Sequence, residues 1–152
     1  MLTHKEEKYE SMLAQARALM AGEPDLTARM ANLAALLHGE MGFWWTGFYR
    51  VCGDELVLGP FQGPVACYRI RKGRGVCGTA WRDECTVVVP DVEAFPGHIA
   101  CSSESRSEIV VPVWDGEAVI AVLDIDSRDL AAFDETDRKY LERMVQVLIT
   151  TE

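Results

Sequence analysis

The sequence predicts an α+β fold, in which a mainly antiparallel sheet of about six strands carries helices from both ends of the chain. Apolar residues recur at the helical period near both termini, whereas the middle of the chain consists of short segments typical of strands. Short Gly-Asp and Asp-Gly turns join some of these segments into hairpins, which favours antiparallel pairing. With 152 residues, the chain is expected to form a single domain over 1–152.

Two helices are expected before the sheet. Residues 5–21 place their apolar side chains on one side of a helix, and Gly22 ends it. Asp25 is a candidate N-cap for a second helix over 26–40. The side chains expected on the apolar side of the first helix are Tyr9, Met12, Leu13, Ala16, Leu19 and Met20.

The sheet is expected to begin with a hairpin. Segments 43–52 and 55–61 have strand character, and Gly53-Asp54 between them is a credible two-residue turn.

Shorter elements are expected in the middle of the chain. A strand over 66–71 precedes the glycine-rich segment 73–78, which is expected to open a short helix through Trp81. Another strand is expected over 85–89. Residues 91–107 are predicted to be mostly loop with one helical turn, and a loop of that length in a compact domain is usually functional.

A second hairpin and a helix complete the fold. Segments 108–114 and 117–126 flank Asp115-Gly116, and Asp134 is predicted to cap a helix that runs to about residue 149. The residues from 118 to 123 are apolar on both faces of the strand, so we expect both sides of the sheet to be covered. The side chains expected on the buried side of the last helix are Leu141, Met144, Val145 and Leu148.

The charge of the chain argues against several classes of partner. A net charge of −9 repels phosphate backbones, so we expect no nucleic-acid binding. The apolar runs have only strand length and the first twenty residues do not resemble a signal peptide, which together predict no membrane span and a cytoplasmic location with reduced thiols. Four basic residues form a cluster close to two of the cysteines: Arg69, Arg71, Lys72 and Arg74. The cluster is interpreted as part of a solvated loop, although cations near a thiol can lower the pKa of that thiol.

Cysteine placement is the main chemical signal. Cys67, Cys77 and Cys101 fall within thirty-five consecutive residues, each in or near a turn-like segment, and none belongs to a CxxC pair. A thiol in a loop can move and react, whereas a structural cysteine is usually fixed inside a strand or helix. The pattern predicts cysteine redox chemistry.

Two carboxylates end the last predicted strand. Asp124 and Asp126 are two residues apart and therefore share a strand face, on which Ala118, Ile120 and Val122 are expected to precede them. They are interpreted as the floor of a pocket. A solvated strand end explains them equally well on this pattern alone.

Two aromatic residues share a face of the first predicted strand. Trp45 and Tyr49 lie on either side of Gly47, which leaves space on that face. Such a pair can form a cage around a methyl-bearing or cationic group. Core packing is the alternative for each aromatic taken singly.

Other site types find little support. The histidines His4, His38 and His98 are far apart, and the Cys/His spacing does not fit a zinc site, so no metal is predicted. A His98–Cys101 dyad is conceivable, but proximity within a loop fixes no geometry. Residues 73–78 match GxGxxG without a surrounding βαβ unit, and a tight glycine turn is the preferred interpretation.

Together these segments resemble the free methionine-(R)-sulfoxide reductases, which are stand-alone GAF domains. The resemblance covers nearly the whole chain and is most specific in Gly-His-Ile-Ala-Cys at 97–101 and Ser-Glu-Ile-Val-Val-Pro at 107–112. Further matches are Phe-Trp-Trp-Thr-Gly-Phe-Tyr at 43–49, Gly-Val-Cys-Gly at 75–78 and Val-Leu-Asp-Ile-Asp-Ser at 122–127.

The resemblance implies a role for each cysteine. Cys101 is expected to be the nucleophile, and its sulfenic acid is expected to form a disulfide with a resolving thiol. Cys67 is the expected resolving residue, while Cys77 matches a third family cysteine that either resolves or lines the pocket. Cys52 and Cys85 match no motif position and are interpreted as structural.

The resemblance also implies the binding site and the partners. Trp45 and Tyr49 match the aromatic lining of the pocket, and Glu108, Asp124 and Asp126 match its acidic residues. The implied activity is reduction of free methionine-(R)-sulfoxide, with no bound cofactor and with thioredoxin as the external reductant. A homodimer through the terminal helices is compatible with the pattern, and the alternatives are a small-molecule sensor or a thiol redox sensor without turnover.

One expectation conflicts with the predicted hairpin. A simple register about Asp115-Gly116 places Glu108 opposite Leu123, on the other face from the two aspartates. For all three carboxylates to share a pocket, either Glu108 lies in the loop before the strand or a β-bulge shifts the pairing.

Overall fold

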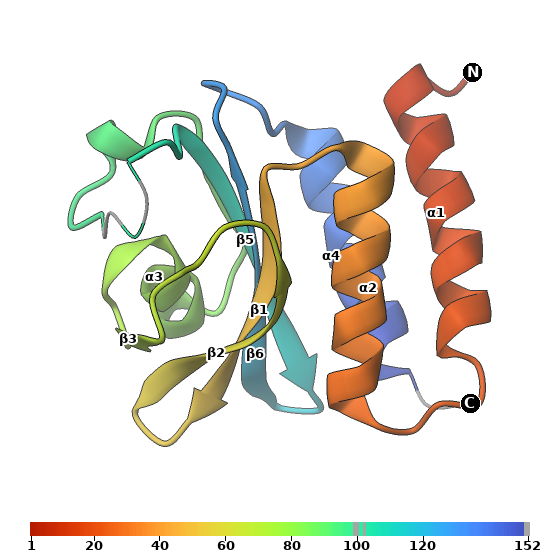
Figure 1. The fold of residues 1–152 in the computed structure, drawn as a ribbon, viewed down its shortest axis with the longest axis horizontal. Helices are drawn as coiled ribbons and strands as arrows, with labels where there is room; N and C mark the ends of the chain where they lie inside the picture. The colour runs from red at the N-terminus through yellow and green to blue at the C-terminus, as the bar shows by residue number, and fades with distance from the viewer. Residues whose placement is uncertain (99–100, 102, 151–152) are drawn as a thin grey trace.

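A computed structural model describes residues 1–98, 101 and 103–150 of the chain. It contains one six-stranded sheet of order β3-β2-β1-β6-β5-β4, in which all neighbouring strands are antiparallel. Helices α2 and α4 lie against one face of the sheet with α1 packed on their outer side, and α3 lies against the other face (Figure 1). The predicted α+β class, with helices from both ends of the chain packed on the sheet, is confirmed.

Every predicted helix and strand is present, although some are shorter than expected. The strands β3 and β4 have only three residues each, because the residues predicted to begin them lie in loops. The predicted helical turn in the long loop before β5 is η1. The bounds are α1 His4–Met20, α2 Leu26–Met41, β1 Trp45–Cys52, β2 Glu55–Gln62, β3 Arg69–Arg71, α3 Gly75–Asp83, β4 Val87–Val89, η1 Val92–Ala94, β5 Ser107–Asp115, β6 Ala118–Ser127 and α4 Glu135–Ile149. No helix in the described ranges is both long and apolar enough to cross a lipid bilayer.

The three-helix face holds the larger hydrophobic core. Asp25 and Asp134 act as the predicted N-caps, because their side chains accept hydrogen bonds from backbone N–H groups of α2 and α4. Leu19 is an exception to the predicted pattern, since 46% of its surface is exposed. It lies at the edge of the apolar side of α1 rather than within the core.

A buried arginine donates hydrogen bonds to backbone carbonyls near the helix ends on this face. Arg29 of α2 is 5% exposed, and its guanidinium donates to carbonyls at the end of α1, in the loop after α1 and at the end of α4. The acceptors, at 2.7 to 2.9 Å, are the carbonyl oxygens of Met20, Glu23, Val147, Leu148 and Thr150. These bonds satisfy carbonyls that a helix end leaves without an intrahelical partner.

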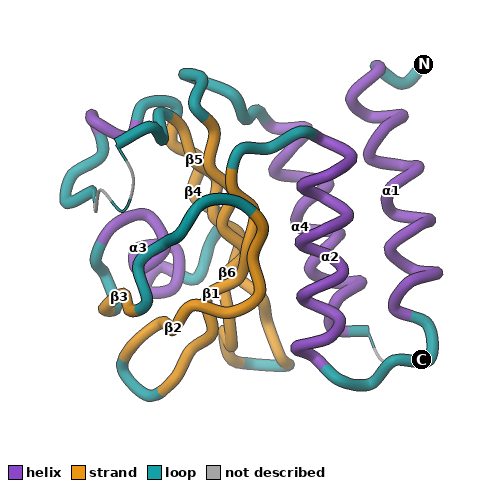
Figure 2. The backbone as a smooth tube through the Cα atoms, viewed as in Figure 1, coloured by secondary structure: helices purple, strands orange, loops and turns teal. Residues whose placement is uncertain are grey.

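The other face is covered by α3 and by loops, as Figure 2 shows. Gly78 allows α3 to approach β3 closely, because a Cβ at this position would lie 2.4 Å from the Arg71 carbonyl oxygen. The GxGxxG match at 73–78 is therefore accounted for by packing. The nine-residue helix α3 and the loops around it leave a hollow on this face.

A β-bulge in β6 sets the side-chain register of the hairpin. Val113 pairs with Ala121 and Trp114 with Val119, which leaves Ile120 without a partner on β5. The bulge reverses the alternation, so Val119 and Val122 face the hollow while Ile120 packs toward the three-helix core. The expectation that Ala118 and Ile120 share the face of Asp124 was wrong for this reason.

Candidate active site

A cavity of about 60 Å³ lies on the α3 face of the sheet, between the strands and the loops that precede β3 and β5. Seven of the eight site residues predicted from the sequence line it, and the eighth, Cys67, is covalently bonded to one of them. The seven are Trp45, Tyr49, Cys77, Cys101, Glu108, Asp124 and Asp126.

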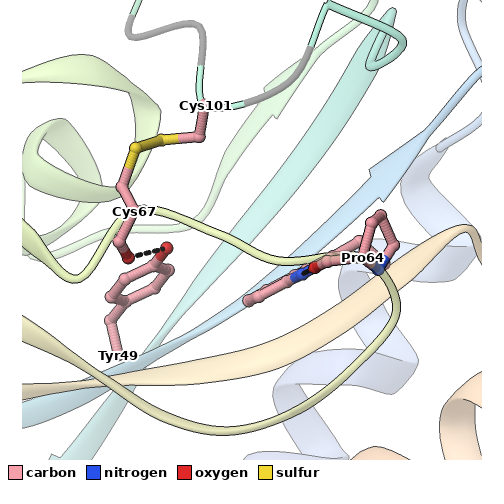
Figure 3. The surroundings of a disulfide bond; sticks show 5 residues. Tyr49, Pro64, Cys67 and Cys101 are labelled. Carbon is pink, nitrogen blue, oxygen red and sulfur yellow. Dashed lines mark hydrogen bonds between the residues drawn. A yellow bond between two sulfur atoms is a disulfide. The ribbon is translucent and has the colours of Figure 1, made fainter.

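The cavity is bordered by a disulfide between Cys67 and Cys101. The two Cα atoms are 5.6 Å apart, and the bond joins the loop before β3 to the loop after η1 (Figure 3). This is the pairing that the family resemblance led us to expect. Cys77 remains a free, buried thiol in α3.

Aromatic residues of β1 hold the loop that carries Cys67. The Tyr49 hydroxyl donates a hydrogen bond of 2.9 Å to the carbonyl oxygen of Cys67, as Figure 3 shows. The Trp45 indole N–H donates to the carbonyl oxygen of Pro64, also at 2.9 Å. Both rings therefore line the cavity and position one of the two disulfide cysteines.

The space above Gly47 is filled rather than open. The Trp45 ring lies over the glycine, and a Cβ at position 47 would be 2.7 Å from Trp45 Cη2 and 2.3 Å from Phe61 Cβ. Trp45 stacks on Tyr49 with ring centroids 6.0 Å apart and on Phe61 with centroids 5.2 Å apart. The pair expected to cage a ligand across a gap instead forms one side of a continuous aromatic wall.

Three carboxyl groups meet on β6 and β5, beside the aromatic residues of β1, where Asp126 pairs directly with Trp45. The turn lies at Gly116-Glu117, one residue later than predicted, and the bulge adds one residue to β6. Together they place Glu108 of β5 directly opposite Asp126, with Asp124 two residues earlier on the same face. Glu108 is 6% exposed and Asp124 is 5% exposed, so the interpretation of a solvated strand end is wrong. Asp126 is half-buried and accepts a hydrogen bond of 3.3 Å from the Ser105 hydroxyl.

Burial and mutual repulsion change the protonation of this cluster. Burial raises the pKa of Glu108 well above its ordinary value, and the neighbouring Asp124 and Asp126 raise it further. Burial and the charge of Asp124 likewise raise the pKa of Asp126 well above its ordinary value, and burial raises that of Asp124. Burial also raises the pKa of the Cys77 thiol. The cluster can therefore keep a proton near neutral pH.

The same cluster contains the atoms that could hold a metal ion. Cys77 Sγ and carboxylate oxygens of Glu108 and Asp124 all lie within 4.8 Å of one another. The absence of a metal stays a prediction from the sequence.

Other predicted residues have different surroundings. His98 lines the cavity, and burial lowers the pKa of its imidazole. Cys52 and Cys85 are both exposed, so the interpretation of these thiols as structural is not supported by packing. The contribution of Ser105 was missed, because one serine in a long loop has no signal in the sequence.

The fold places this chain in the class of GAF-domain proteins. A family model described as GAF domain matches residues 20–148. The "GAF domain-containing protein A" of Dictyostelium discoideum is 57% identical over 145 residues, which are 95% of this chain and 92% of that protein.

Within this class, the chain belongs to the free methionine-R-sulfoxide reductase family. It is 45% identical over 154 aligned residues to the Escherichia coli protein of that name, with 98% of this chain and 93% of the relative covered. The X-ray structure of the enzyme from Neisseria meningitidis, in complex with its substrate, has a TM-score of 0.94 and 52% identity, covering 98% of this chain and 90% of that one.

Proposed function

We propose that this chain reduces free L-methionine-(R)-sulfoxide to L-methionine, with Cys101 as the nucleophile. The observation that carries the proposal is a disulfide-bonded cysteine pair on a cavity that also holds three carboxyl groups. The names of the relatives support the same substrate.

The reducing step uses the thiolate of Cys101 and one protonated carboxyl group. The thiolate attacks the sulfoxide sulfur while the carboxyl group protonates the sulfoxide oxygen. The oxygen passes to the cysteine sulfur as a sulfenic acid, and methionine leaves with its sulfur reduced by two electrons. The thiol of Cys67 then condenses with the sulfenic acid, releasing water and forming the disulfide.

Different carboxyl groups serve different purposes in this scheme. Glu108 and Asp126, whose pKa values are raised by burial and by the neighbouring charge of Asp124, supply the proton. Asp124 supplies the negative charge that binds the substrate ammonium. Peptide-bound methionine sulfoxide has no such ammonium, so this arrangement selects the free amino acid.

The aromatic wall binds the apolar part of the substrate. Trp45 and Tyr49 are buried, and both line the cavity. Contact with their rings favours the S-methyl group and the methylene chain of the substrate.

Regeneration requires an external two-electron donor. We propose thioredoxin as this reductant and no bound cofactor, since exchange with a dithiol restores both cysteines. A homodimer is part of the proposal as well, and the sedimentation velocity of the purified protein tests it.

A coupled assay tests the activity. The protein is mixed with free methionine-R-sulfoxide, thioredoxin, thioredoxin reductase and NADPH, and NADPH oxidation is followed. We expect turnover that Cys101→Ser abolishes, with no turnover of the S epimer. Tight binding of the sulfoxide without turnover would instead indicate a sensor.

A further inference from the structure

Two large apolar side chains beside Cys67 are almost fully exposed. Val65 is 88% exposed and Tyr68 is 77% exposed. Among the large apolar residues within the described ranges, only Met1 at the start of the chain exceeds them. Val65 also lines the cavity, whereas Tyr68 does not, and an exposed apolar pair beside a reactive disulfide favours an interaction surface over solvated surface.

The loop that carries these side chains is held by its backbone. Three of its carbonyls accept hydrogen bonds of 2.9 Å from the fold, two from the side chains of Trp45 and Tyr49 and one from the backbone N–H of Leu58. The accepting carbonyls are those of Pro64, Cys67 and Tyr68. Since the backbone is fixed, the side chains of Val65 and Tyr68 are presented outward without a cost in loop ordering on binding.

The charge of this region is opposite to that of the whole chain. Residues 65–75 contain four basic residues and no acidic one, whereas the protein has a net charge of −9. Arg74 belongs to this segment and lines the cavity together with Cys101. The segment that follows Cys67 is therefore exposed and basic, with Arg69 paired to Glu55 at 3.4 Å, and it favours a partner that is apolar at its centre and acidic around it.

We propose that Val65, Tyr68 and the basic residues of 65–75 form the docking surface for an acidic dithiol protein that reduces the Cys67–Cys101 disulfide. This inference rests on the proposed function, because the disulfide is its reaction product. The partner's thiolate bonds to Cys67 Sγ, the sulfur–sulfur bond breaks, and Cys101 takes the electron pair as a thiolate. A second thiol of the partner then displaces Cys67, so the partner leaves as a disulfide and both protein thiols are restored.

Attack at Cys67 follows from the position of the surface. Val65 and Tyr68 flank Cys67 in the chain, so a partner seated on them brings its cysteine to that sulfur. Departure of Cys101 as the thiolate also returns the nucleophile directly to the cavity that it lines.

The experiment compares two reductants on the same variant. Turnover of Tyr68→Ser is measured with thioredoxin as the acidic dithiol protein and with dithiothreitol, which is too small to need a docking surface. We expect kcat/KM for thioredoxin to fall about tenfold, as for a central aromatic in an interface, with the dithiothreitol rate unchanged. Leu19→Ser removes an exposed apolar side chain from α1, on the opposite face of the sheet, and is expected to change neither rate.

Charge and attack position are tested separately. Added salt is expected to lower kcat/KM for thioredoxin but not the dithiothreitol rate. A thioredoxin variant without its second active-site cysteine is expected to form a mixed disulfide with Cys67 when mixed with the oxidised protein.

Three results would overturn the inference. These are an unchanged thioredoxin rate in Tyr68→Ser, an equal loss with both reductants, and a mixed disulfide found at Cys101. A wild-type protein inactive with both reductants would instead overturn the proposed function. Mixed-disulfide formation does not depend on substrate turnover and would still test the surface.

Discussion

Glu108 and Asp126 are direct cross-strand partners in the β5–β6 pair, and their carboxyl groups therefore lie on the same face of the sheet. Two like charges in this position are unfavourable on a solvated surface. Here they stand beside Asp124 in a buried cluster, where retained protons relieve the repulsion and provide the acid that the proposed reaction needs.

Removing either proton donor is expected to abolish most activity while leaving the fold intact. Glu108→Gln and Asp126→Asn keep the shape of the side chain but cannot transfer a proton to the sulfoxide oxygen. We expect kcat to fall about 100-fold or more in each, with circular dichroism spectra like that of the wild type. Near-wild-type kcat in both variants would contradict the acid role.

The stability of Glu108→Gln is expected to exceed that of the wild type increasingly as the pH rises above 4.5. Because burial raises the pKa of Glu108, the folded state keeps a proton that the unfolded state releases between the ordinary and the folded pKa. The wild type therefore loses stability as the pH rises through this window, by up to about 1.4 kcal/mol per pH unit. Urea unfolding of both proteins from pH 4 to 8 measures the difference in their free energies of unfolding. Glu117→Gln at the exposed hairpin turn is the control. Parallel stability curves for Glu108→Gln and the wild type would show that the carboxyl is not perturbed.

Loss of the resolving thiol is expected to stop the cycle after one event. Cys67→Ser should release about one methionine per chain and accumulate a sulfenic acid that a specific probe labels.

Cys77→Ser should still form the Cys67–Cys101 disulfide when substrate is added without reductant, as peptide mapping would reveal. A Cys77–Cys101 disulfide in the wild type would reassign the resolving role.

Adding one methyl group at Gly47 is expected to disturb the aromatic wall. Gly47→Ala places a Cβ 2.3 Å from Phe61 Cβ and 2.7 Å from Trp45 Cη2, so both the indole and the Phe61 position on β2 must shift. We expect a destabilisation of about 2 kcal/mol and a higher KM for the sulfoxide. Gly39→Ala in α2 is the matched control, since a Cβ there meets nothing within 4 Å, and it should be neutral or stabilising. Equal stability of the two variants would show that Trp45 and Phe61 adjust without cost.

Arg29 is expected to be a major source of stability far from the cavity. Arg29→Met removes the guanidinium donor from five carbonyl acceptors, which lie at the end of α1, in the loop after α1 and at the end of α4. The free energy of unfolding should fall by at least about 3 kcal/mol, with Arg29→Lys intermediate because an ammonium has fewer donors. Denaturant unfolding measures it, and Arg17→Met, on the exposed surface of α1, is the control. A small loss in Arg29→Met would mean that water replaces the guanidinium.

Local signals in the sequence were sufficient for the order of elements and most of the site. Asp25 and Asp134 act locally, because an N-cap bonds to backbone groups within a few residues. The spacing of Asp124 and Asp126 fixes their shared face in any strand. The cysteine roles and the place of Glu108 in the pocket came from the family resemblance.

Features that depend on pairing across the fold could not be obtained in the same way. The bulge at Ile120 is a property of two strands together, and no residue type marks it. The Trp45 ring fills the space above Gly47 because Phe61 of the next strand supports it, and that partner is not evident from β1 alone.

The Cys67–Cys101 bond closes a ring in the chain that contains β3, α3, β4 and η1. Cross-linking cysteines 34 positions apart reduces the entropy of the unfolded chain and stabilises the folded one by about 4 kcal/mol. The oxidised protein should therefore resist proteases better than the reduced protein. In the proposed cycle, a cell short of reducing equivalents would accumulate the oxidised protein, which is degraded more slowly. This protein would become active again when the reductant reduces its disulfide.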